Sequence, residues 1–291
     1  MLEVEITQAD EGTVLRQFLK DRLQLSSRYI KKLTQEKRFL LINGRPVTVR
    51  YRLQAGDRFC LKFPEETRSE SLLAEDLPLD VVYEDDWLLV LYKDAGIPSI
   101  PSREHPRGTI ANALLGYYQA KELPYTVHIV TRLDKGTSGL MLVAKHHLSH
   151  SRLSQAQRQG RIERYYEALV EGRVERNRGK IDRPIRRKQS SIIEREVGPG
   201  GQEAITYFNV VRRYRHYTHV QLRLETGRTH QIRVHFSSLG HPVVGDTLYG
   251  AREGVLAHHA LHCHSLKFPH PYTGQPLSFY AKAPASWNQL L

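Results

Sequence analysis

The chain has 291 residues, of which 40% are hydrophobic, and its 43 Lys and Arg against 31 Asp and Glu give a formal charge of +12. This composition excludes a disordered chain, and no apolar run is long enough to cross a bilayer. The length predicts one full domain with a small accessory domain, and the positive charge favours a polyanion such as nucleic acid as the partner.

The N-terminal segment MLEVEITQADEG is acidic and alternating, unlike the basic and then apolar pattern of a secretion signal. Cys60 and Cys263 are the only cysteines, which is too few for a disulfide framework, and their spacing fits neither a metal site nor a redox pair. We therefore expect a soluble, cytoplasmic protein that acts as a monomer and binds no metal.

The first 63 residues predict a small α/β domain. A helix follows Thr13, and Ser26 or Ser27 can cap a second helix over residues 27–38. Short strands then surround the turn at Asn43–Gly44. This arrangement resembles the alpha-L RNA-binding module over residues 13–63, and the resemblance implies that RNA docks on the basic face of the second helix, formed by Arg28, Lys31, Lys32 and Lys37. The alternative is a generic helical cap with solvated lysines.

Residues 64–77 are polar and acidic, and they predict a linker to a second domain over residues 78–291. That domain carries a predicted helix over residues 107–121 and many short strands. Two strands are predicted within residues 79–93, on either side of residues 84–86, and further strands over residues 127–134, 140–145, 164–172, 179–185, 203–214 and 218–226. Strand and helix do not alternate regularly, so the sequence predicts an α+β fold with a mixed, mostly antiparallel sheet.

A dense basic stretch covers residues 172–189 and ends in Arg186, Arg187 and Lys188. It fits a solvated hairpin and a loop that contacts phosphates equally well.

The segment TRLDKGTSGLMLVAK, residues 131–145, joins charged residues to a purely apolar strand. In an extended stretch Arg132 and Asp134 share one face, while Leu133 points into the core. Gly136 and Gly139 permit a tight turn close to a substrate. On its own, this pattern fits an arginine–aspartate pair on the surface at least as well as a catalytic element.

Two later segments bring further candidates. Residues 161–172, RIERYYEALVEG, predict a strand with Tyr166, whose ring could stack on a base or simply lie half-buried. Residues 225–250 predict a helix over QIRVHFSSL, with Thr229 as its cap, Gly240 at its end and Arg233 near its start. Its expected inward residues are Ile232, Phe236 and Leu239.

These three segments, in this order, resemble the signature segments of the RNA pseudouridine synthase family of the ribosomal large-subunit type. The resemblance spans most of residues 79–285 and implies that Asp134 is the catalytic residue. It also implies that Arg132, Tyr166 and Arg233 support the site, with Arg233 paired to Asp134. The sequence departs from the family pattern at Thr131, where histidine is usual, at Arg164, where lysine is commoner, and at Asp94, where proline is usual.

The implied reaction is the isomerisation of uridine in RNA, which requires no cofactor. Ribosomal RNA is the favoured substrate and transfer RNA a second possibility. A non-catalytic RNA-binding or ribosome-assembly factor is the main alternative. A metal site at His258, His262 and His264 is less favoured, because the run lacks the HExxH arrangement of a zinc protease.

Overall fold

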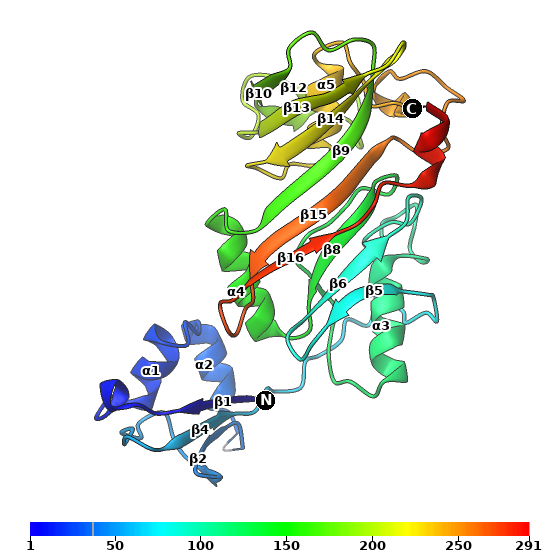
Figure 1. Cartoon of the computed structure of the whole chain (residues 1–291). Coiled ribbons are helices and arrows are strands. Elements are labelled where there is room, and N and C mark those ends of the chain that lie inside the picture. The colour runs from blue at the N-terminus through cyan, green and yellow to red at the C-terminus, as the bar shows by residue number, and fades with distance from the viewer. Residues whose placement is uncertain (37, 291) are drawn as a thin grey trace. The chain divides into compact units, whose positions relative to one another are not determined.

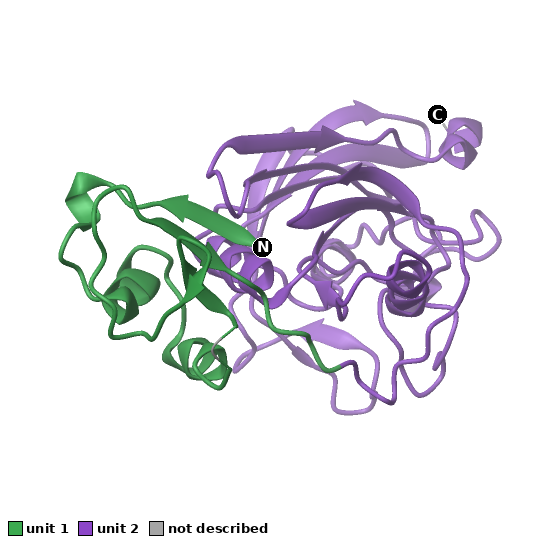
Figure 2. Ribbon diagram, turned by 90° about the horizontal axis from the view of Figure 1, so that it is seen from below, with its two compact units in different colours: residues 1–67 green, residues 68–291 purple. Residues whose placement is uncertain are grey.

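The computed structural model describes residues 1–36 and 38–290. The chain forms two compact units, residues 1–67 and residues 68–291, which Figure 2 shows in different colours. The segment predicted as a linker, residues 64–77, is thus divided between them. Its second half joins the larger unit because Glu75 accepts a hydrogen bond from the backbone N–H of Gly108, at 2.7 Å. Lys37, one of the predicted RNA-binding residues, lies outside the described residues.

The smaller unit contains two helices and an antiparallel sheet with strand order β1-β4-β2-β3. The ring of Phe18 packs edge-on against that of Phe59, with 5.8 Å between the centroids, and joins the first helix to the sheet. The elements are β1 (Leu2–Glu5), η1 (Gln8–Asp10), α1 (Leu15–Asp21), α2 (Ser27–Leu33), β2 (Leu40–Ile42), β3 (Arg45–Pro46) and β4 (Arg58–Leu61).

Helix α2 carries the predicted basic face. Ser26 caps it, since its Oγ accepts a hydrogen bond of 3.1 Å from the backbone N–H of Tyr29. The helix ends at Leu33 and not at residue 38 as predicted, because Thr34 follows and its hydroxyl donates to the carbonyl of Lys31. Its exposed face carries Arg28, Lys31 and Lys32.

The larger unit is built on one ten-stranded sheet, whose main strand order is β10-β13-β14-β9-β15-β8-β6-β5. Among the described residues every strand pair in it is antiparallel except β15 with β8, so the predicted fold class is confirmed. The strands are β5 (Asp80–Glu84), β6 (Leu88–Lys93), β7 (His128–Ile129), β8 (Ser138–Ala144), β9 (Glu163–Glu171), β10 (Arg178–Asp182), β13 (Ile205–Arg213), β14 (Tyr217–Leu224), β15 (Leu261–Pro269) and β16 (Pro276–Tyr280).

A small hairpin and several helices complete this unit (Figure 1). The hairpin pairs β11 (Ile185–Arg187) with β12 (Arg195–Val197). The helices are α3 (Ile110–Ala120), α4 (His147–Arg158), α5 (Gln231–Ser237), η2 (Thr247–Tyr249) and η3 (Ala285–Leu290). Strands β6 and β8 are buried along nearly their whole length, which makes them a stiff centre for the segments attached to them.

The larger unit differs from the predictions at several further points. Residues 130–134 are a loop, because only His128 and Ile129 pair with β8. Helix α4 was not predicted, since its sequence is polar and buries only a few side chains. Helix α5 ends at Ser237, and Leu239 is exposed instead of pointing inward.

Candidate active site

Asp134 lies in the loop between β7 and β8, at the start of the central strand. The loop closes as a tight turn, in which the backbone N–H of Thr137 donates to the carbonyl of Asp134 at 3.1 Å. Gly139 then adopts a φ of +113°, and a β-carbon there would lie 2.3 Å from the carbonyl oxygen of Cys263. Only glycine fits where β8 meets β15, so this residue fixes the start of the strand that follows the Asp134 loop.

The backbone on both sides of Asp134 is held by buried side chains. The hydroxyl of Ser99 donates to the carbonyl of Leu133 at 2.6 Å and accepts from its N–H at 3.2 Å. On the other side, the ammonium of Lys93 donates to the carbonyl of Lys135 at 3.2 Å. Because these contacts fix the residue before and the residue after, Asp134 has little freedom to move.

Thr131 stands where the related family usually has histidine, and its role here is structural. The side chain is buried, and its hydroxyl accepts a hydrogen bond of 2.9 Å from the backbone N–H of Leu142. It therefore ties the loop to β8 at a point three residues before Asp134.

Arg233, on α5, joins Asp134 to a second carboxylate. Its Nη1 lies 3.2 Å from Oδ2 of Asp134, which is the contact expected from the sequence. Its Nε and Nη2 each donate to Asp246 at 2.7 Å, and the guanidinium also lies 4.9 Å from the centre of the Tyr249 ring. Asp246 lies within the same 225–250 segment, but no predicted role attaches to it.

His230 precedes α5 in a left-handed backbone conformation, with φ 58° and ψ 21°. It occupies the cap position predicted for Thr229, and its side chain makes no cap hydrogen bond. Its Nε2 lies 3.9 Å from Oδ2 of Asp134. A non-glycine residue in this conformation usually marks a constraint from the surrounding structure.

The contacts of Tyr249 favour one tautomer of His230. The hydroxyl oxygen of Tyr249 accepts the backbone N–H of Arg195 at 3.0 Å and lies 2.8 Å from Nδ1 of His230. A backbone N–H can only donate, so the hydroxyl is free to give its own hydrogen to Nδ1. When the hydroxyl donates in this way, the proton of the neutral imidazole lies on Nε2, the nitrogen that faces Asp134.

The electrostatics keep Asp134 ionised. Burial alone would raise the pKa of Asp134, but the positive charges of protonated His230, of Arg233 and of protonated His259 outweigh it at the acid pH where the carboxyl titrates, and its pKa is lowered. Burial also lowers the pKa of His230. His230 is therefore neutral at pH 7, and the fixed positive charge beside Asp134 comes from Arg233.

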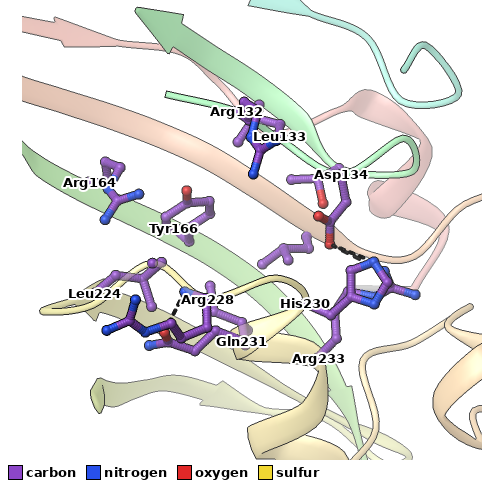
Figure 3. Close-up of a pocket in the computed structure, with 14 residues that line it drawn as sticks. Arg132, Leu133, Asp134, Arg164, Tyr166, Leu224, Arg228, His230, Gln231 and Arg233 are labelled. Carbon is purple, nitrogen blue, oxygen red and sulfur yellow. Dashed lines mark hydrogen bonds and ion pairs between the residues drawn. The ribbon is translucent and has the colours of Figure 1, made fainter. Parts of the chain in front are cut away.

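The four residues expected at the site line one depression (Figure 3). They are Asp134, Arg132, Tyr166 and Arg233. Arg164 lines it too, and its Nε is buried without a hydrogen-bond partner among the described residues. Tyr166 is only 5% exposed, and burial raises the pKa of its hydroxyl, so the ring is a neutral surface inside a cationic rim.

Gly227 makes room for one side of this rim. A β-carbon at this position would lie 2.8 Å from Nη1 of Arg164. The absence of a side chain at Gly227 thus lets the Arg164 guanidinium lie across the backbone.

The predicted RNA-binding residues of the larger unit lie on the β11–β12 hairpin. Arg186 pairs with Glu196 at 2.9 Å, and Lys188 pairs with Glu194. Arg187 donates to backbone carbonyls of its own loop. Several of these positive charges are thus partly neutralised by acidic residues of the same hairpin. The basic side chains are held in an ordered hairpin by these contacts.

Among residues 1–36 and 38–290, no cluster of His, Cys, Asp and Glu has the arrangement of a metal site. His262 hydrogen-bonds Ser138 through Nδ1, at 2.8 Å, and His264 faces Glu167. Within the same described ranges, no helix is long and apolar enough to span a membrane.

Comparison with known proteins places these features in one family. The family model for RNA pseudouridylate synthase matches residues 87–238. An uncharacterized RNA pseudouridine synthase of Bacillus subtilis, YjbO, is 52% identical over 87% of this chain and 89% of its own length. The ribosomal large subunit pseudouridine synthase D of Vibrio parahaemolyticus is 41% identical over 84% of this chain and 79% of its own length.

A solved structure gives the same result for the fold. Human RNA pseudouridylate synthase domain containing 1 is similar with a TM-score of 0.59 and 24% identity, over 75% of this chain and 87% of the human chain.

Proposed function

Because the chain belongs to the RNA pseudouridylate synthase family and so isomerises uridine in RNA to pseudouridine, we propose that Asp134 is its catalytic residue and acts at the ribose. One observation carries this proposal. Asp134 is an ionised carboxylate, held by Arg233, at the edge of a depression that also contains a neutral aromatic ring and further arginines. The alternative of a non-catalytic RNA-binding factor has no support from these features.

The reaction explains why one carboxylate is enough. The bond between N1 of uracil and C1′ of ribose breaks, the base turns, and a bond forms between C5 and C1′. The hydrogen of C5 leaves to solvent while N1 gains one, so the product has the same atoms and oxidation state as the substrate. Asp134 can add to C1′ as a nucleophile or remove a proton from the ribose, and both routes need it ionised. We expect no cofactor and no metal.

The supporting residues have separate parts in this proposal. Arg233 keeps Asp134 charged and oriented. The ring of Tyr166 would stack on the uracil base, and such stacking contributes about 1 to 3 kcal/mol to binding. Arg132 is exposed at the rim and would hold the space left by the extruded uridine or a neighbouring phosphate.

We further propose that flanking RNA docks on two basic surfaces, the β11–β12 hairpin and the exposed face of α2 in the smaller unit. The basic α2 face supports a role for residues 1–63 as an alpha-L type RNA-binding module. We also propose that the enzyme acts as a monomer.

The proposed substrate is ribosomal RNA of the large subunit, because the similar Vibrio parahaemolyticus enzyme carries that substrate in its name. We also propose that the enzyme works in the cytoplasm, where bacterial ribosomal RNA is made. The test is a pseudouridine map of total RNA from cells without the gene, complemented with the wild type or with Asp134→Asn. The proposal is supported if a pseudouridine in large-subunit ribosomal RNA is lost without the gene and restored only by the wild type. If the lost pseudouridine lies in transfer RNA instead, transfer RNA is the substrate.

A further inference from the structure

The β11–β12 hairpin exposes two neighbouring isoleucines at its tip. Ile192 is 76% exposed and Ile193 is 44% exposed. Ile192 is the most exposed of the large hydrophobic residues in the described part of the chain. Two adjacent β-branched side chains are thus exposed to water inside an otherwise charged hairpin, where they form a small apolar surface.

The tip is held in one shape by the arginines that flank it. Arg187 donates to the carbonyl of Ile192 at 3.0 Å, and Arg195 donates to the carbonyls of Ile193 and Glu194 at 3.1 and 3.0 Å. The hydroxyl of Ser191 accepts the N–H groups of Ile193 and Glu194. These contacts satisfy the backbone of the loop, so the isoleucines are presented by an ordered turn.

The hairpin is also attached to the active site. Ile193 lines the same cleft as Arg132 and Asp134. The loop end of the hairpin contacts the site through the backbone N–H of Arg195, which donates to the hydroxyl oxygen of Tyr249, and Tyr249 in turn contacts His230. An RNA whose uridine reaches Asp134 therefore passes the hairpin tip.

We propose that Ile192 and Ile193 form an apolar wedge that contacts the unstacked bases beside the extruded uridine. This inference rests on the proposed function. Extruding a base exposes the faces of its neighbours to water, and apolar side chains inserted at such a step replace part of the stacking that is broken. The arginines and the lysine of the hairpin would contact the adjacent phosphates. Because the isoleucines are surrounded by positive charge, RNA is a better fit as the partner than an apolar protein surface.

The test compares the full-length double variant Ile192→Ser/Ile193→Ser with the wild type and with Val211→Ser, which removes a 50% exposed valine from β13. The probe is large-subunit ribosomal RNA transcribed in vitro with 5-tritiated uridine. At saturating RNA we expect the double variant to release tritium about tenfold more slowly, with an unchanged Tm. Val211→Ser should match the wild type. The conservative variant Ile192→Leu/Ile193→Leu should retain most of the rate, because it keeps the apolar surface.

A photo-crosslinking residue in place of Ile192 gives an independent readout. Crosslinks to bases of the RNA are expected. An unchanged rate in the double serine variant, or crosslinks only to proteins of a ribosomal fraction, would overturn the wedge. If the wild type itself releases no tritium, the proposed function fails; if the wild type and the double variant are equally active, only the wedge fails.

Discussion

Arg233 binds Asp246 through two hydrogen bonds of 2.7 Å, whereas its contact with Asp134 is a single one of 3.2 Å. Asp246 is only 2% exposed, so its carboxylate is matched almost entirely by this one guanidinium. The stronger pair fixes the arginine, and the remaining nitrogen is left to face the carboxylate at which we expect the chemistry. Asp246 thus positions Arg233, and Arg233 positions Asp134.

Asp246→Asn should destabilise the larger unit by about 3 to 5 kcal/mol, because the buried guanidinium loses the charge that compensates it. Urea unfolding checks this value. Asp182→Asn is the control, since Asp182 lies in an exposed ion pair with Lys180 and should change stability by less than about 0.5 kcal/mol. Equal stability for the two variants would contradict the assigned role of Asp246.

Tyr249→Phe should change the tautomer of His230 while keeping the ring beside Arg233. Without the hydroxyl, Nδ1 has no donor to hold it unprotonated, and the Nε2–H form should lose population. Nitrogen-15 spectra of labelled histidine measure this, with the His230 signals assigned from their loss in His230→Asn. The rate of tritium release should fall together with the Nε2–H population.

The control for this prediction is Tyr280→Phe, which removes the hydroxyl of a 63% exposed tyrosine. It should leave both the spectra and the rate unchanged. If Tyr249→Phe leaves His230 as the Nε2–H tautomer, the proposed hydrogen-bond chain from Arg195 is wrong.

Lys93 should give stability a distinct dependence on pH. Burial lowers the pKa of Lys93 to about 8, below the unfolded value of about 10.4. Between these values the unfolded chain binds more protons than the folded one, so this group makes the free energy of unfolding rise with pH. From pH 8 to pH 10 the wild type should gain on the order of 2 kcal/mol relative to Lys93→Met. The exposed Lys282→Met should show no such difference, and parallel curves for wild type and Lys93→Met would disprove the depressed pKa.

The basic face of α2 should affect RNA affinity and its response to salt. Arg28→Gln/Lys31→Gln should reduce the slope of log affinity against log salt by about 0.7 for each phosphate that the protein no longer neutralises. Filter binding at several salt concentrations measures the slope, and tritium release at saturating RNA should not change. The matched variant Arg16→Gln/Lys20→Gln removes two exposed charges from α1 and should change the slope less. If the two double variants change the slope equally, the α2 face contributes only through the net charge of the protein and is not a specific RNA-binding surface.

The sequence predicted much of the site because its parts lie in short continuous segments. Arg132 and Asp134 are two residues apart, and Arg233 falls near the start of a helix that hydrophobic spacing already indicates. Their meeting depends on the sheet, in which β8 pairs with β15 although more than 100 residues separate them in the chain. The spacing of residues along the chain does not predict that these segments meet. The resemblance to a family does.

Other features could not be predicted because tertiary contacts create them. Nothing local in the sequence places His230 in a left-handed conformation, which depends on its surroundings, among them Tyr249. Asp246 follows a turn beyond α5, and only the folded turn brings it beside Arg233. The loop at residues 130–134 looks like a strand by its apolar pattern, but Ser99 and Thr131 hold its backbone in another shape.

Asp134 is the residue at which we place the chemistry, and the decisive experiment is tritium release from RNA that contains 5-tritiated uridine. Asp134→Asn keeps the size and shape of the side chain, so folding and RNA affinity should stay close to those of the wild type. We predict that this variant binds the RNA and releases no tritium above the background without enzyme. Release at the wild-type rate would show that Asp134 is not the catalytic residue.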